Sequence, residues 1–93
     1  MARGGETRQA LQNLSALVEA AGSSLEHVLK TTVFLLNIGD FQQMNAVYAE
    51  FFPNDAPART TVQAAALPKG AAVEIECLAR IPSGRKIAAR RKK

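Results

Sequence analysis

The charged side chains with the most chemical potential lie in two extended runs in the second half of the chain. The first run carries Arg59, and the second run carries Glu74 and Glu76. If the two runs lie side by side, a guanidinium and two carboxylates come together. Such groups need one another, water or a charged ligand as partners, because an unpaired buried charge is costly.

A Leu-Pro-Lys-Gly sequence at residues 67–70 separates the two runs. Proline fixes φ for a turn and glycine permits positive φ, so this sequence predicts a tight turn between two strands. The second run has a period of two, which places one apolar set on one face of a sheet: Val73, Ile75, Cys77 and Ala79.

Pairing of residues 67 and 70 would place Gln63 opposite Glu74 and Thr61 opposite Glu76. Arg59, Gln63, Glu74 and Glu76 would then share one face of a hairpin. One hypothesis is a binding site on this face. The alternative is an exposed polar face with weak ion pairs, and the spacing taken alone favours that alternative.

Two amphipathic helices and one further strand are expected to support these runs. An apolar stripe predicts a helix over residues 6–21, ended by Gly22. Residues 27–36 are rich in β-branched residues and apolar on both faces in their second half, which is typical of a central strand. A second helix is expected from Asp40 as N-cap, with Gln43 completing a capping box, to about residue 52, before Pro53.

The expected order is therefore helix, strand, helix, strand, strand, in one domain of 93 residues. This order predicts a two-layer α+β fold with both helices on one face of the sheet. The other face is expected to be solvated or covered by another subunit.

The basic residues are unevenly distributed. The chain has a net charge of +4, and six of its twelve basic residues lie in the tail: Arg85, Lys86, Arg90, Arg91, Lys92 and Lys93. The other six, against eight acidic residues, leave residues 1–84 slightly acidic. The tail could bind nucleic acid or an anionic surface. A disordered, solubilising extension is favoured, because the tail has no aromatic residue to stack on bases and no helix-period apolar stripe.

Several classes of site are not supported by the composition. No apolar run approaches the roughly 20 residues that span a bilayer, and residues 1–6 lack the apolar core of a secretory signal. Cys77 falls among apolar strand positions and is expected to be a core residue. The single histidine, His27, has no zinc-ligand spacing around it. We expect a cytoplasmic protein, with a mitochondrial location as the alternative.

Residues 57–76 resemble the C-terminal signature of the Rid family of reactive intermediate deaminases, also called the YjgF or L-PSP family. The signature contains Pro-Ala-Arg-Thr-Thr-Val-Gln, then Leu-Pro-Lys-Gly, then Val-Glu-Ile-Glu. The resemblance extends upstream through Lys-Thr-Thr-Val-Phe-Leu at 30–35, Asp-Phe at 40–41 and Met-Asn-Ala-Val-Tyr at 44–48. It covers about residues 4–81, so residues 1–81 are expected to form a partial Rid-like domain and 82–93 a separate tail.

The resemblance implies chorismate-mutase-like subunits that form trimers with active sites in the clefts between neighbours. It implies hydrolysis of 2-imino and 2-enamino acids, such as 2-aminoacrylate, to 2-oxo acids and ammonia, as in 2-iminobutanoate/2-iminopropanoate deaminases. No metal or organic cofactor is implied. By the same resemblance, Arg59 binds the substrate carboxylate, Glu74 positions or activates water, Thr61 lines the pocket, and Glu76 has a structural role.

The start of the chain departs from the family pattern. Family members carry further strands before the first helix, with a tyrosine and a Ser-Gly-Gln run that line the pocket, and residues 1–6 do not match them. A truncated gene product and a short paralogue are both compatible with this. We expect an exposed strand edge and marginal stability as a consequence. The functional alternatives are an RNA-binding, endoribonuclease-type translation inhibitor and a non-catalytic subunit of mixed trimers with full-length relatives.

Overall fold

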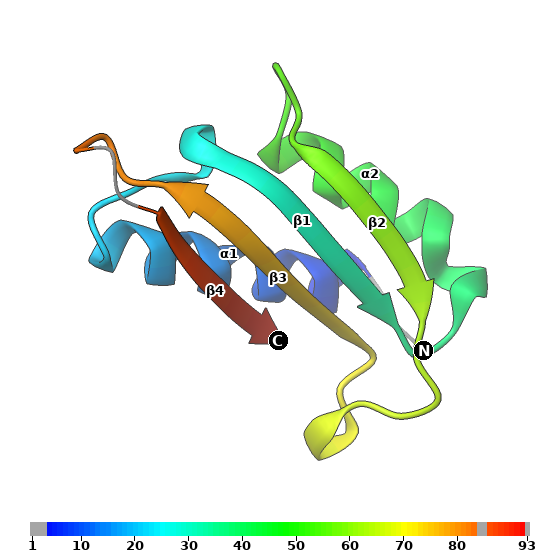
Figure 1. Ribbon diagram of the computed structural model, residues 1–93. Coiled ribbons are helices and arrows are strands. Elements are labelled where there is room, and N and C mark those ends of the chain that lie inside the picture. Colours follow the sequence, from blue (N-terminus) through cyan, green and yellow to red (C-terminus); the bar gives the residue numbers. More distant parts are fainter. Residues whose placement is uncertain (1–3, 84–85, 93) are drawn as a thin grey trace.

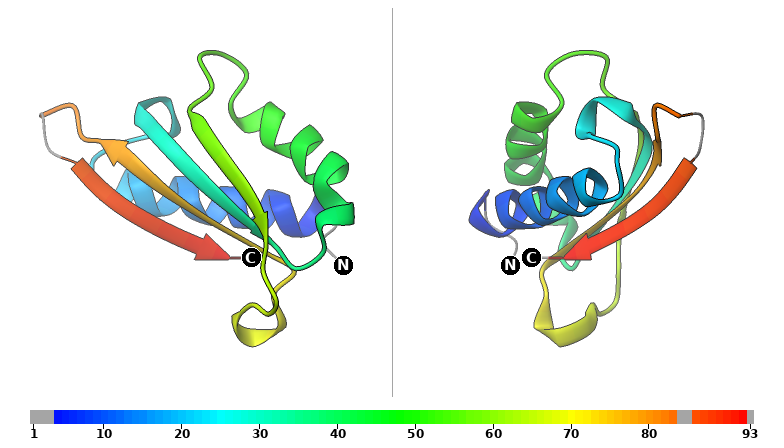
Figure 2. Two further views of the ribbon diagram at one scale, coloured as in Figure 1. Left: turned by 45° about the vertical axis from the view of Figure 1, so that its right-hand side comes forward. Right: turned by 90° about the vertical axis from the view of Figure 1, so that its left-hand side faces the viewer.

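A four-stranded sheet forms one layer of the computed structural model, which describes residues 4–83 and 86–92. The strand order within this described part is β2-β1-β3-β4. The strands are β1 (Val28–Leu35), β2 (Ala58–Gln63), β3 (Val73–Arg80) and β4 (Lys86–Lys92). Helices α1 (Gly4–Ala20) and α2 (Phe41–Phe51) form the second layer. Both pack against the same face of the sheet (Figures 1 and 2), which confirms the expected two-layer α+β fold.

The apolar stripe of α1 faces the sheet and forms much of the core. Its fully buried members are Ala10, Leu11, Leu14 and Val18. They meet the buried side chains of β3, which alternate along the strand as the sequence predicts: Val73, Ile75, Cys77 and Ala79. After α1 the backbone reaches φ +93° at Gly22, a conformation that glycine adopts without a steric penalty.

Strand β1 is central, as its two-sided apolar sequence predicts. It pairs in parallel with β2 and antiparallel with β3. Thr31, Val33 and Leu35 are fully buried on the side that faces the helices. The position of β1 decides which residues of its two neighbours share a face.

The expected hairpin between β2 and β3 is wrong, because β1 lies between these two strands. The connection from Gln63 to Val73 spans residues 64–72 and crosses the end of β1. The Pro-Lys-Gly segment forms a short 3-10 turn, Pro68–Gly70, within this connection, with φ of 57° at Lys69 and 69° at Gly70. The turn residues therefore have their expected role, but the turn joins two strands that are not neighbours.

The C-terminal segment is also different from the expectation. Residues 86–92 were expected to belong to a disordered tail, but they form β4, which pairs antiparallel with β3 from Glu74 to Arg80. Ala89 is buried and Ile87 packs against the core, so alternate β4 side chains face the helix layer. The far edge of β3 is therefore paired, and the expected exposed edge is not found there. Arg85 and Lys93 lie outside the described residues.

Two short 3-10 turns, Leu25–His27 and Ile38–Asp40, precede β1 and α2 respectively. Asp40 occupies the N-cap position of α2 as predicted, but its side chain makes no capping hydrogen bond there, so the predicted capping box is wrong. The Asn37 side chain instead accepts a hydrogen bond from the Gly39 amide at 2.8 Å. Helix α2 ends at Phe51, ahead of Pro53, as the sequence predicts.

Candidate functional site

The strand register places Arg59 and Glu74 on opposite faces of the sheet. Arg59 of β2 pairs in register with Thr31 of β1, and Thr31 is fully buried beneath the helices. Glu74 is the register partner of Phe34, one residue out of phase with the buried Val33 and Leu35. Partners across a strand pair project to the same side, and successive residues alternate between sides. Arg59 therefore belongs to the helix-covered face and Glu74 to the open face.

The other predicted site residues divide in the same way. Thr61 pairs with Val33, and Gln63 with Leu35, so both lie with Arg59 on the covered face. The Thr61 hydroxyl is buried and has no hydrogen-bond partner, while Gln63 Oε1 accepts a hydrogen bond from the Ile38 amide at 2.8 Å. Glu76 is on the open face with Glu74. The predicted single polar face with Arg59, Gln63, Glu74 and Glu76 is wrong, because it depended on the hairpin.

Neutral groups of α2 hold the Arg59 guanidinium. Arg59 Nη1 donates a hydrogen bond to Asn45 Oδ1 at 2.7 Å. Arg59 Cζ lies 4.7 Å from the centre of the Tyr48 ring and 5.5 Å from that of Phe41. A cation over an aromatic face is attracted by the electron-rich ring. None of these three partners is a carboxylate, so none neutralises the positive charge of Arg59.

Tyr48 is itself fixed by its neighbours. Its hydroxyl lies 2.7 Å from Thr31 Oγ1, in a buried hydrogen bond that joins α2 to β1. Its ring packs against Phe52, with the ring centres 4.7 Å apart. Burial raises the pKa of the Tyr48 phenol, while the hydrogen bond to Thr31 and the charge of Arg59 act in the opposite direction. The net shift is upward, so the phenol stays neutral at neutral pH.

A surface hollow of about 380 Å³ opens beside Arg59. Its lining is mostly apolar and comes from α2 with its C-cap, the segment before β2, and β2 itself: Asn45, Tyr48, Ala49, Phe52, Ala56, Pro57 and Arg59. A guanidinium has five N–H donors, and the Asn45 bond occupies one of them. The remaining donors suit a carboxylate, which accepts two parallel hydrogen bonds from one arginine. The hollow therefore places a cation beside a small, mostly apolar space.

Sequence analysis missed the three α2 residues that hold Arg59. Phe41 and Asn45 are four residues apart, and Asn45 and Tyr48 are three apart, so all three project from one side of the helix. That spacing is a usable signal. In the sequence, the aromatic members of this set were interpreted as part of the apolar stripe of α2. Only the position of β2 beneath this helix shows which side of α2 faces Arg59.

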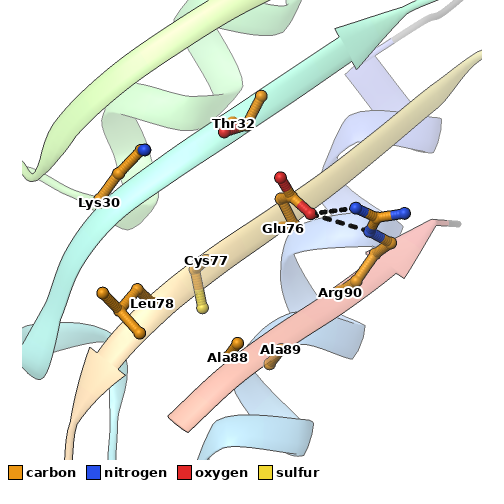
Figure 3. Close-up of a pocket in the computed structure, with 8 residues that line it drawn as sticks. All are labelled: Lys30, Thr32, Glu76, Cys77, Leu78, Ala88, Ala89 and Arg90. Carbon is orange, nitrogen blue, oxygen red and sulfur yellow. Dashed lines mark hydrogen bonds and ion pairs between the residues drawn. The ribbon is translucent and has the colours of Figure 1, made fainter. Parts of the chain in front are cut away.

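The open face has a different electrostatic organisation, shown in Figure 3. Arg90 of β4 donates through Nε and Nη2 to Glu76 Oε2, and this ion pair is largely exposed. The Arg90 guanidinium also lies 5.8 Å from the Phe34 ring centre. Glu76 raises the pKa of Arg90, and Glu74 adds a smaller contribution in the same direction. The carboxylates of β3 are thus partly neutralised by β4.

A second hollow, of about 400 Å³, lies beside this ion pair. Its lining comes from three strands: Lys30, Thr32, Glu76, Cys77, Leu78, Ala88, Ala89 and Arg90. Cys77 is buried, as the strand alternation predicts, and burial raises the pKa of its thiol. A thiol with a raised pKa is a poor nucleophile at neutral pH. This hollow therefore lacks an activated group, and Arg59 marks the better candidate site.

Within residues 4–83 and 86–92, no group of three or more His, Cys, Asp or Glu side chains is placed to hold a metal ion. No helix in that same part of the chain has the length and apolar content needed to cross a membrane.

A sequence model of the family described as Endoribonuclease L-PSP matches residues 3–81. A RutC family protein from Pyrococcus horikoshii is 50% identical over 74 residues, which cover 80% of this chain and 59% of that protein. The human 2-iminobutanoate/2-iminopropanoate deaminase is 46% identical over 74 residues, covering 80% of this chain and 54% of the human protein. The chain therefore spans between half and two thirds of the length of these two relatives.

The fold is also found among solved structures. The crystal structure of E. coli TdcF with bound serine superposes with a TM-score of 0.72 and 34% sequence identity. The match covers 94% of this chain and 61% of TdcF. These likenesses confirm the expected chorismate-mutase-like architecture.

Proposed function

This chain belongs to the Endoribonuclease L-PSP family, which includes the Rid proteins, and from that premise we propose that it acts on 2-imino and 2-enamino acids. The proposed reaction is their hydrolysis to 2-oxo acids and ammonia. The observation that carries the proposal is the Arg59 hollow, in which a guanidinium with neutral partners faces a small, mostly apolar space. Relatives named as deaminases of this class support the reaction type.

In the proposed reaction, Arg59 binds the substrate carboxylate and holds the C=N carbon near the wall of the hollow. Water adds to that carbon, and a proton passes to the nitrogen. The hydroxyl group of the resulting carbinolamine then loses its proton while the amino nitrogen gains one, so the C–N bond breaks, ammonia leaves and the 2-oxo acid remains. Glu74 is proposed to take the proton from water and to return it to the leaving nitrogen, which is general acid-base catalysis. An enamine substrate first gains a proton on carbon and loses one from nitrogen, which gives the imine.

The positions of Arg59 and Glu74 constrain where this can happen. Because the two residues lie on opposite faces of one sheet, a site that uses both requires two copies of the chain. We assign the Arg59 hollow to one copy and Glu74 to the open face of a neighbour. Thr61 lies on the covered face, two residues from Arg59, but its hydroxyl is buried and the residue does not line the Arg59 hollow, so we assign it no contact with the ligand there.

The test is release of ammonia or 2-oxo acid from freshly generated 2-iminobutanoate, measured against the uncatalysed rate. Loss of a charge-assisted contact costs about 1.5–3 kcal/mol, so Arg59→Gln is expected to lower kcat/KM by about 10- to 100-fold. Arg80→Gln is the matched control, since Arg80 is an exposed arginine at the end of β3. Equal rates for the wild type and Arg59→Gln would remove the proposal.

A mixing experiment tests whether the site is shared between copies. Arg59→Gln and Glu74→Gln chains are each expected to keep only a small fraction of the wild-type rate, and they are then unfolded and refolded together. Random assortment should restore about one quarter of the wild-type rate, because a site is intact when each neighbour supplies its unaltered residue. Failure to restore activity, in mixtures shown to contain both chains, would contradict a shared site.

A further inference from the structure

We propose that Thr31 is a positioning residue for Arg59 and acts through the hydroxyl of Tyr48. The inference rests on the proposed function of Arg59 as a carboxylate receptor. It assigns a ligand-binding role to a buried strand residue that does not itself touch the hollow.

The first step is the contact between Thr31 and Tyr48. Thr31 lies in β1, the central strand, and is the register partner of Arg59. Its side chain is fully buried, and its hydroxyl lies 2.7 Å from the Tyr48 hydroxyl. Either oxygen can donate this bond. Because both groups are buried, loss of one partner leaves the other unsatisfied, and an unsatisfied buried hydroxyl is costly.

The second step is the contact between Tyr48 and Arg59. The guanidinium carbon lies 4.7 Å from the centre of the Tyr48 ring, while Phe52 packs against the same tyrosine. The backbone of α2 fixes one end of this side chain, and Thr31 fixes the hydroxyl at the other end. The ring plane is therefore held at both ends, and with it the surface on which the guanidinium lies. Asn45 sets the direction of one N–H group.

The third step is the charge that remains on Arg59. Burial raises the pKa of the Tyr48 phenol, so the tyrosine is neutral at neutral pH. A phenolate would form an ion pair with Arg59 and compete with an incoming anion. With a neutral phenol, the arginine is supported by the ring but keeps its charge for the ligand. The hydrogen bond to Thr31 directs the hydroxyl toward β1.

Thr7 provides a closely matched control for this inference. It is also a fully buried threonine, but its hydroxyl has no hydrogen-bond partner. Thr→Val at either position exchanges the same atoms at a buried site. Only Thr31→Val removes a partner of Tyr48, so a difference between the two variants reports on the hydrogen bond.

The experiment is a titration with 2-oxobutanoate as a stable carboxylate probe, followed by nuclear magnetic resonance, together with KM and kcat for 2-iminobutanoate. Thr31→Val is expected to weaken probe binding and raise KM by about 3- to 10-fold, with kcat changed less than twofold. Thr7→Val should leave both values unchanged. Thr31→Ser restores the hydroxyl and should recover most of the affinity. Thermal melts confirm that each variant is folded.

The outcomes separate this inference from the proposed function. Probe binding that is unaffected by Arg59→Gln would overturn the receptor role of Arg59, and the inference with it. Loss of binding in Arg59→Gln, with equal binding in Thr31→Val and Thr7→Val, would overturn the positioning role alone. If Thr31→Val does not fold, Tyr48→Phe breaks the same bond from the other side and keeps the ring. Wild-type affinity in a folded Tyr48→Phe variant would then overturn the inference.

Discussion

The two faces of the sheet hold their arginines in opposite ways. On the covered face, Arg59 lies against an amide and two aromatic rings, all of them neutral. On the open face, Arg90 also lies over an aromatic ring, but it is paired with the carboxylate of Glu76. The ring is common to both settings, so the carboxylate is what distinguishes them.

The difference between the two arginines bears on where an anionic ligand would bind. A guanidinium that already shares a carboxylate gains little from a second one, whereas a guanidinium with neutral partners offers its full charge. The exposed pair on the open face is also screened by solvent and contributes little to stability. The covered face therefore combines the core that stabilises the fold with an arginine whose amide and aromatic partners are neutral, which is why we propose the anion site there.

The largest expected difference between the faces is in stability. Ile75 is fully buried on the covered face, while Val62 on the open face is 39% exposed. Ile75→Ala should lower the free energy of unfolding by about 2–5 kcal/mol, because it leaves a cavity among packed side chains. Val62→Ala should change it by no more than about 0.5 kcal/mol. Urea unfolding of both variants is the measurement, and similar losses would mean that the open face is covered in solution.

An intermediate difference is expected in anion binding. Arg59→Lys keeps the positive charge but loses the planar fork, so affinity for 2-oxobutanoate should fall about 10-fold. Arg90→Lys is the matched change on the open face and should leave that affinity unchanged. Isothermal titration of the two variants tests this. A larger loss for Arg90→Lys would move the receptor role to the open face.

The smallest effect is expected from an exposed ion pair between the two helices. Arg8 donates a hydrogen bond to Glu50 at 2.8 Å, and this bond, followed by the charge of Arg8, lowers the pKa of Glu50. A carboxyl group whose pKa is lower in the folded than in the unfolded protein stabilises the fold at pH values above its unfolded-state pKa, which is about 4.3 for glutamate. This contribution is lost as the pH falls through the folded-state pKa.

The Tm of the wild type is therefore expected to fall as the pH drops below about 4.3, and to fall slightly more than the Tm of the Glu50→Gln variant does. Thermal melts of both proteins between neutral and acidic pH give the comparison. An identical acid profile for the two proteins would show that this pair makes no contribution, and a large decrease would show that the helices depend on it more than its exposure indicates.

The parts of the fold that follow local patterns were predictable from the sequence. The apolar stripe of α1 and the alternation in β3 report burial directly, and the structure confirms both. The pairing of β2 depends on β1, more than twenty residues upstream, and no local pattern shows that this strand enters between β2 and β3. The apparent hairpin was therefore wrong although its strands and turn residues were recognised.

The candidate site was predictable to a similar degree. The family signature singled out Arg59, Thr61 and Glu74, but their distribution over two faces follows from the register with β1. Asn45 and Tyr48 could have been grouped by their helical spacing. Their role was not predictable, because it depends on where α2 lies over β2. The strand character of β4 was hidden by its charge, and only Ile87 and Ala89 hinted at an inward side.

Strand β4 also has a consequence for how copies of this chain meet in solution. It is the last strand in the sheet order, and its exposed cations include Lys86, Arg90 and Arg91. Two such edge strands brought side by side would repel each other, and charged edge strands are a recognised protection against edge-to-edge association of sheets. The Debye length falls from about 8 Å at physiological ionic strength to about 3 Å at 1 M. Concentrated salt should therefore weaken this protection, and dilute buffer should keep the protein dispersed.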